Sequence, residues 1–200
     1  EENFNGYFSV ENGTPSSEQN RYGIAKGGFG YRWHEHDERF RADLHPNEPN
    51  RFGWVVEVDP YDKRSVPKKR TALGRFKHEG AMVTLARDNR VVVYMGDDER
   101  NEYIYKFVSA RRFRKNNRRV NANLLDEGTL YVAKFKAGHI PGDMEGIGEW
   151  IPLIHGQNGL TAENGFRDQA EVLIKTRQAA DRVGATMMDR PEWIAIDENT

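Results

Sequence analysis

The stretch that decides the fold runs from residue 79 to residue 109 and reads EGAMVTLARDNRVVVYMGDDERNEYIYKFVS. Four short runs rich in β-branched and aromatic residues lie in it or just beyond it: 79–86, 90–95, 102–109 and 129–135. The turn-forming triplets Arg87-Asp88-Asn89 and Gly96-Asp97-Asp98 separate the first three runs, and a basic segment precedes the fourth. This pattern predicts a four-stranded antiparallel meander over 79–135, which is the unit of a propeller blade.

The flanking sequence differs in composition and in the periodicity of its apolar residues. Residues 11–52 are rich in Gly, Asn, Pro, Ser and charge without clear periodicity, which predicts a long irregular connection. From 167 to 183, apolar or small residues recur at helical spacing and stop at Gly184, so we expect one amphipathic helix packed on the β framework. Further strands are expected at 53–60 and at both ends of the chain, so we interpret the chain as part of a larger domain.

Composition excludes several classes of protein. The longest apolar runs, such as 90–95, are too short for a membrane-spanning helix. Lys and Arg number 30 and Asp and Glu 31, giving a net charge of -1, so no global field would attract nucleic acid or an anionic membrane. The basic segment 111–119 is therefore interpreted as a solvated loop. The chain has no cysteine, which excludes disulfides and thiolate metal sites.

Carboxylates stand directly before three of the expected inner strands, at Glu1-Glu2, Glu79 and Glu192. Inner strands of propeller blades begin beside the central channel, so these acids would converge there. The loop 96–102 opens on the same face and adds further acids together with Arg100. The alternative is that these acids only keep strand edges soluble.

Converging carboxylates repel one another, and a hard cation would resolve that repulsion. Oxygen ligands without cysteine suit calcium, magnesium, manganese or ferric iron rather than structural zinc. Arg100 could hold a phosphate oxyanion beside such a cation, which points to phosphoryl chemistry. His34 and His36 could share a metal only on an extended segment and are better explained as part of a hydrogen-bonded loop.

Several segments, in this order along the chain, carry a family resemblance: 1–8 (EENFNGYF), 51–60 (RFGWVVEVDP), 73–80 (LGRFKHEG), 96–108 and 188–193 (MDRPEW). Together they resemble the PhoX-type alkaline phosphatase family over almost the whole chain. The resemblance implies an all-β fold, a six-bladed β-propeller, of which this chain would form a part of roughly two to three blades with one inserted helix. The range 1–200 would then belong to a single propeller domain.

The resemblance also implies an activity and a site. Such enzymes hydrolyse phosphate monoesters with a calcium and iron cluster and are exported to the periplasm or outside the cell. The implied metal ligands are Glu1 or Glu2, Glu79, Glu102 and Glu192, and Arg100 is implied as the catalytic, phosphate-contacting residue. Side chains alternate along a strand, so only one residue of the Glu1-Glu2 pair should face the metals.

The resemblance has limits. The family's earlier metal-binding segments, with an Asn-His-Glu type motif and a cysteine, have no counterpart here, nor does a signal peptide. We therefore expect the intact parent, as a monomer, to act on small-molecule phosphate esters without nucleic-acid or membrane partners, whereas this chain by itself need not bind metal or be active. Two alternatives stay open: a calcium-stabilised propeller that only binds a ligand, and a propeller hydrolase for phosphodiesters, phytate or lactones.

Overall fold

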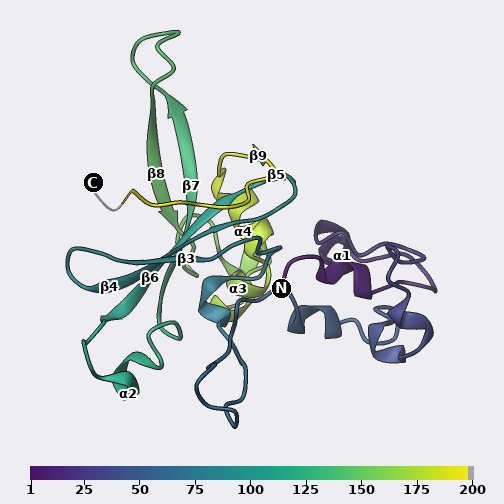
Figure 1. The fold of residues 1–200 in the computed structure, drawn as a ribbon. Helices are drawn as coiled ribbons and strands as arrows, with labels where there is room; N and C mark the ends of the chain where they lie inside the picture. The colour runs from purple at the N-terminus through teal and green to yellow at the C-terminus, as the bar shows by residue number, and fades with distance from the viewer. Residues whose placement is uncertain (198–200) are drawn as a thin grey trace.

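A five-stranded antiparallel sheet forms the centre of the molecule (Figure 1). The computed structural model describes residues 1–197. The strands follow the order β3-β4-β6-β7-β8. They are Met82–Leu85 (β3), Arg90–Gly96 (β4), Ile104–Arg112 (β6), Gly128–Ala137 (β7) and Gly146–Pro152 (β8). The expected four-stranded meander thus corresponds to the first four strands of this sheet, and β8 extends it beyond the predicted range.

The run expected at 102–109 does not form one strand. It divides at Tyr103, so that Arg100–Glu102 (β5) leaves the sheet and pairs with Met188–Asp189 (β9). The Tyr103 carbonyl instead accepts from the Asp97 N–H at 3.2 Å, which closes the loop after β4. The first residue of the expected strand, Glu102, therefore pairs with β9, whereas the remainder, in β6, pairs with β4 and β7 of the sheet.

The core lies between this sheet and two short helices. Val93, Met95 and Phe107 are fully buried, as their alternation along β4 and β6 requires when one face packs inward. They belong to one apolar cluster with Val172 and Ala179 of the helical segment. The helices therefore cover one face of the sheet, as Figure 1 shows.

The helical segment is not the single helix expected at 167–183. It consists of Gln169–Ile174 (α3) and Thr176–Val183 (α4), with a break at Lys175. At the break, the Arg75 N–H donates to the Leu173 carbonyl at 3.0 Å and to Thr176 Oγ1 at 3.0 Å. A distant backbone N–H thus takes the place of intrahelical hydrogen bonds and interrupts the helix.

Residues 1–52 form a lobe beside the sheet (Figure 1). Its helices are Ser17–Arg21 (α1) and the 3-10 turns Phe4–Tyr7, Trp33–Glu35, Glu38–Phe40 and Glu48–Arg51. The strand expected at 1–8 is therefore wrong. Phe8, Val10, Ile24, Phe40 and Ala42 make a small apolar core of their own, so the irregular segment is ordered by side-chain packing rather than by regular hydrogen bonding.

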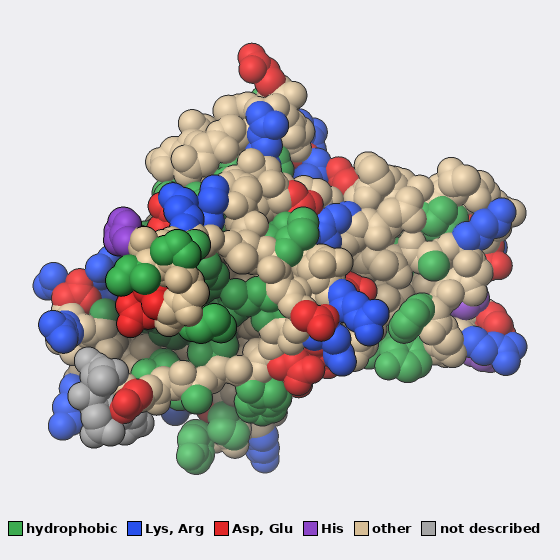
Figure 2. All heavy atoms as spheres, turned by 90° about the horizontal axis from the view of Figure 1, so that it is seen from above, with side chains coloured by type: hydrophobic (Ala, Val, Ile, Leu, Met, Phe, Trp, Pro, Cys, Tyr) green, Lys and Arg blue, Asp and Glu red, His purple; other side chains and the backbone are tan. Residues whose placement is uncertain are grey.

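The remaining elements are short. They are Val56–Glu57 (β1), which pairs with Lys68–Lys69 (β2), Arg118–Asn121 (α2), and the 3-10 turns Thr71–Leu73 and Ala162–Asn164. The strand expected at 53–60 thus shrinks to two residues, and 191–197 contains no strand. The structure is mostly β with few helices, and no helix within 1–197 is both long and apolar enough to cross a membrane. On the face in Figure 2, acidic and basic side chains are interspersed.

Candidate metal site

Three carboxylates from distant parts of the sequence meet at one point. Glu2, Glu79 and Asp98 each offer an oxygen, and these oxygens all lie within 4.8 Å of one another. Glu2 and Glu79 are half-buried, and Asp98 is 9% exposed. Among the residues 1–197 that the structure describes, this is the one group of acidic or histidine side chains with the spacing of a metal site.

Backbone hydrogen bonds fix two of these residues. The Asp98 N–H donates to the Lys77 carbonyl at 3.0 Å, and His78 and Asp97 form an isolated antiparallel bridge. The segment before β3 therefore runs beside the loop after β4, which brings Glu79 close to Asp98. Glu2 reaches the same point from the start of the N-terminal lobe.

The oxygens of this group fit a hard cation. Asp98 Oδ2 accepts from Arg190 Nη2 at 2.9 Å, but Asp98 Oδ1 is buried without a hydrogen-bond partner among the described residues. Burial, together with the neighbouring Glu2 carboxyl, raises the pKa of Glu79. An unpartnered buried oxygen and crowded carboxyls are the features that a bound cation would relieve. The donor set is all oxygen, which suits calcium, magnesium, manganese or ferric iron.

A buried ion-pair network supports the loop that carries Asp98. Arg177 of α4 donates from Nε to Asp97 Oδ2 at 2.8 Å and from Nη2 to Asp97 Oδ1 at 2.5 Å, and both residues are almost completely buried. Arg177 also pairs with Glu99 at 2.9 Å. The network holds the loop against α4, so it positions Asp98 through the neighbouring residue.

The chain is similar to known proteins over its whole length. A family profile described as alkaline phosphatase PhoX matches residues 1–200. The chain belongs to the PhoX alkaline phosphatase family. It is 52% identical to the solved structure described as Pseudomonas fluorescens PhoX in complex with vanadate, a transition state analogue, with a TM-score of 0.95. That match covers 100% of this chain and 35% of the other. No curated protein sequence gives a significant match.

Within this PhoX-family chain, Glu102 lies outside the three-carboxylate group. Its carboxylate accepts from Arg21 Nη2 at 3.0 Å and lies 3.5 Å from Arg177 Nη1. Burial raises the pKa of Glu102 to about 7, and the hydrogen bond from Arg21 opposes that rise. Arg21 also donates to Asp181 of α4 at 2.9 Å, so Arg21 links the N-terminal lobe to β5 and to α4.

Of the Glu1-Glu2 pair, Glu2 belongs to the carboxylate group of this PhoX-family chain and Glu1 points elsewhere. Glu1 Oε2 accepts from the N–H groups of Gly53 and Trp54 at 3.0 and 3.1 Å, and Glu1 Oε1 lies 2.9 Å from Lys69 Nζ. The expectation that one member of the pair faces a metal therefore has a specific candidate in Glu2.

Arg100 and Glu192 lie outside the three-carboxylate group, and their side chains are exposed. The Arg100 side chain is 82% exposed, and its Nε lies 3.9 Å from Asp189 Oδ1, so its guanidinium has no close hydrogen bond to that carboxylate. Glu192 Oε1 lies 3.6 Å from Arg190 Nη2. The segment that carries Glu192 crosses directly over Gly96, where an added Cβ would stand 2.3 Å from the Pro191 carbonyl oxygen.

Two residues of the site were not singled out from the sequence. Asp98 lies in the acidic loop that was predicted to face the channel, but nothing in the sequence distinguishes it from its acidic neighbours. Arg190 precedes the Pro-Glu-Trp segment, and its contact with Asp98 spans 92 residues. Only the folded arrangement shows that these two residues meet.

Proposed function

We propose that the intact protein that carries this chain hydrolyses phosphate monoesters and holds a cation at Glu2, Glu79 and Asp98. The observation that carries the proposal is the group of three carboxylates, one of which, Asp98, has a buried oxygen (Oδ1) without a hydrogen-bond partner among the described residues. Membership of the PhoX family supports the reaction, and the likeness to a chain solved with a transition-state analogue supports it further. Because the chain spans about a third of that relative, the activity is assigned to the intact protein.

We propose calcium and iron as the cations. When bound, they would supply Lewis-acid stabilisation of the phosphate oxygens. Glu2, Glu79 and Asp98 would hold them through oxygen atoms, with Arg190 orienting the Asp98 carboxylate. For Glu102 and Glu192 to act as further ligands, each carboxylate would have to exchange an arginine for the cation.

We assign phosphate binding to Arg100. Its guanidinium is 82% exposed, and its one ion pair within residues 1–197 is the long contact of 3.9 Å with Asp189, so it is available to an incoming anion. Arg190 also lies beside the site, but it already pairs with Asp98 and Glu192. We therefore expect Arg100 to contact substrate and Arg190 to position a ligand.

The wider setting is also proposed from the family. The intact protein would form a β-propeller, with this chain as part of it, and would act as a monomer on small phosphate esters in the periplasm or outside the cell.

The proposed function is tested on that intact protein. Hydrolysis of a chromogenic phosphate monoester is measured before and after treatment with a chelator, and bound calcium and iron are measured by elemental analysis.

Matched variants locate the site. Asp98→Asn and Glu79→Gln are expected to lose bound metal and activity together, whereas Arg100→Ala is expected to keep its metal and to raise KM. Glu163→Gln, an exposed acid on a distant 3-10 turn, is the control and should change neither. Unchanged metal content in Asp98→Asn would refute the assignment of the site, and bound metal without hydrolysis would favour a binding protein.

A further inference from the structure

An aromatic cavity opens beside the carboxylate group. Its volume is about 270 Å³, and Glu2 lines it, so it adjoins the proposed cation site. The rings of Tyr7, Trp33, Phe40 and Phe52 form much of its lining. All four come from the N-terminal lobe, a part of the chain to which the proposed reaction assigns no role apart from that of Glu2.

These rings make one continuous surface. The ring centres of Tyr7 and Trp33 are 5.1 Å apart, and those of Trp33 and Phe40 are 5.4 Å apart in an edge-to-face arrangement. Phe52 extends the surface, with its centre 6.2 Å from that of Phe40. Trp33 is 51% exposed, which leaves ring surface open to solvent.

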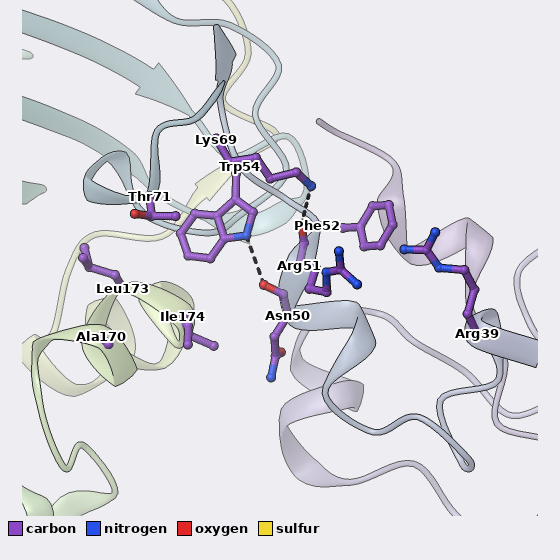
Figure 3. A pocket seen from close by; sticks show the side chains of 10 residues that line it. All are labelled: Arg39, Asn50, Arg51, Phe52, Trp54, Lys69, Thr71, Ala170, Leu173 and Ile174. Carbon is purple, nitrogen blue, oxygen red and sulfur yellow. Dashed lines mark hydrogen bonds between the residues drawn. The ribbon is translucent and has the colours of Figure 1, made fainter. Parts of the chain in front are cut away.

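The charge of the lining indicates the kind of ligand. A neighbouring cavity of about 460 Å³, shown in Figure 3, also contacts Phe52 but is lined by the cations Arg39, Arg51 and Lys69. The aromatic cavity is lined instead by Glu1 and Glu2, and none of the described residues that line it is Lys, Arg or His. Because the Glu1 carboxylate pairs with Lys69, Glu2 supplies the negative charge of this cavity.

The Phe52 ring already makes a cation–π contact within the protein. Lys69 Nζ lies 4.6 Å from its centre, on the side of the neighbouring cavity. An aromatic ring attracts a cation through the negative potential of its face, and quaternary ammonium groups are suited to such surfaces because their methyl groups also make apolar contacts. Carboxylates beside the rings strengthen the preference for a cation.

We propose that this cavity binds the trimethylammonium part of a choline-type phosphate ester while the phosphate group reaches the carboxylate site. The proposal rests on the proposed phosphatase function. In the reaction, the phosphorus–oxygen bond to the amino alcohol breaks, water supplies the oxygen of the new bond to phosphorus, and its proton goes to the leaving alkoxide. The products are the free amino alcohol and inorganic phosphate. Glu2 would face both parts of the substrate.

The test compares two substrates of the same shape on the intact protein. One is choline phosphate, and the other is its uncharged analogue in which carbon replaces the nitrogen. We expect kcat/KM to be about fivefold higher for choline phosphate, since a cation at an aromatic surface is favoured by that order of magnitude. Trp33→Leu should abolish the preference. Tyr61→Leu, which removes an aromatic ring 89% exposed elsewhere, should keep it.

Equal kcat/KM for the two esters, or a preference that survives in Trp33→Leu, would overturn the proposal. A second measurement is independent of catalysis: tetramethylammonium is titrated into the protein and followed by calorimetry. Binding that is weakened about fivefold or more in Trp33→Leu supports the cavity, and absence of binding overturns it. If neither ester is hydrolysed, the phosphatase function fails and the titration alone decides the role of the cavity.

Discussion

Replacing Arg177 with Met should cost this protein a large part of its stability. The guanidinium is 1% exposed and donates two hydrogen bonds to Asp97, which is 0% exposed, and a third to Glu99. Methionine can occupy the space of the aliphatic stem, but it leaves the Asp97 carboxylate buried with the Lys77 N–H as its one remaining donor among residues 1–197. The substitution therefore removes one partner of a buried ion pair and leaves the other, Asp97, in place.

The expected magnitude follows from these contacts. Breaking a buried pair by removing one partner costs about 3–5 kcal/mol. Charge-assisted hydrogen bonds are worth about 1.5–3 kcal/mol each, so the two to Asp97 alone account for that range. Since small domains are stable by about 5–15 kcal/mol, Arg177→Met would come close to unfolding under ordinary conditions.

Equilibrium urea denaturation followed by tryptophan fluorescence measures the change. Arg182→Met, on the exposed side of the same helix, is the control and should change stability by less than about 0.5 kcal/mol. In the double variant with Asp97→Asn, removal of the buried charge should recover about 2 kcal/mol relative to Arg177→Met alone. A cost below about 1 kcal/mol for Arg177→Met would refute the view that this network holds the acidic loop in place.

Three further predictions concern packing and pH. Phe107→Ala, at a completely buried position, should lower the free energy of unfolding by about 3–5 kcal/mol in the same assay, and a cost below about 1 kcal/mol would contradict the core assignment. Gly96→Ala would place a Cβ 2.3 Å from the Pro191 carbonyl oxygen, so we expect faster proteolysis of the segment that follows. Hydrogen bonds from Arg167 hold the pKa of Glu171 at about 2, below its usual 4.5, so this stabilisation is present above pH 4.5 and is lost as pH falls toward 2. Acid denaturation of Glu171→Gln should be correspondingly less steep over that interval, and an unchanged curve would count against the pairing.

The sequence predicted the part of the fold that depends on local pattern. Residues 90–95 form the core of β4 because a short run of β-branched and other apolar residues suits a buried strand, and Val91, Val92 and Val93 are all buried. It did not predict β8, because Gly146 and Gly148 interrupt any alternation there. Nor could it predict the break at Lys175, since the N–H that interrupts the helix belongs to Arg75, 101 residues before Thr176.

Some residues of the candidate site could likewise be predicted from local sequence, whereas others depend on contacts between distant parts of the chain. Acidic residues before apolar runs led to Glu2 and Glu79, because that pattern is visible within a few residues. The pairing of Glu102 with Arg21 and of Asp98 with Arg190 depends on contacts across 81 and 92 residues. No local pattern records such contacts, so the sequence could place acids near the site without saying which would keep an unpartnered oxygen.

The contacts that build the site also bear on how the chain folds. Arg21 and Asp181, which anchor the network behind the acidic loop, are 160 residues apart, and Arg190 reaches Asp98 across 92. Contacts of such long range form slowly, because the entropy of closing each large loop must be overcome before the contact contributes. We therefore expect the strands of the meander to pair first and the three carboxylates to meet last. Cation affinity measured during refolding would then be a late signal, one that marks completion of the tertiary structure rather than growth of the sheet.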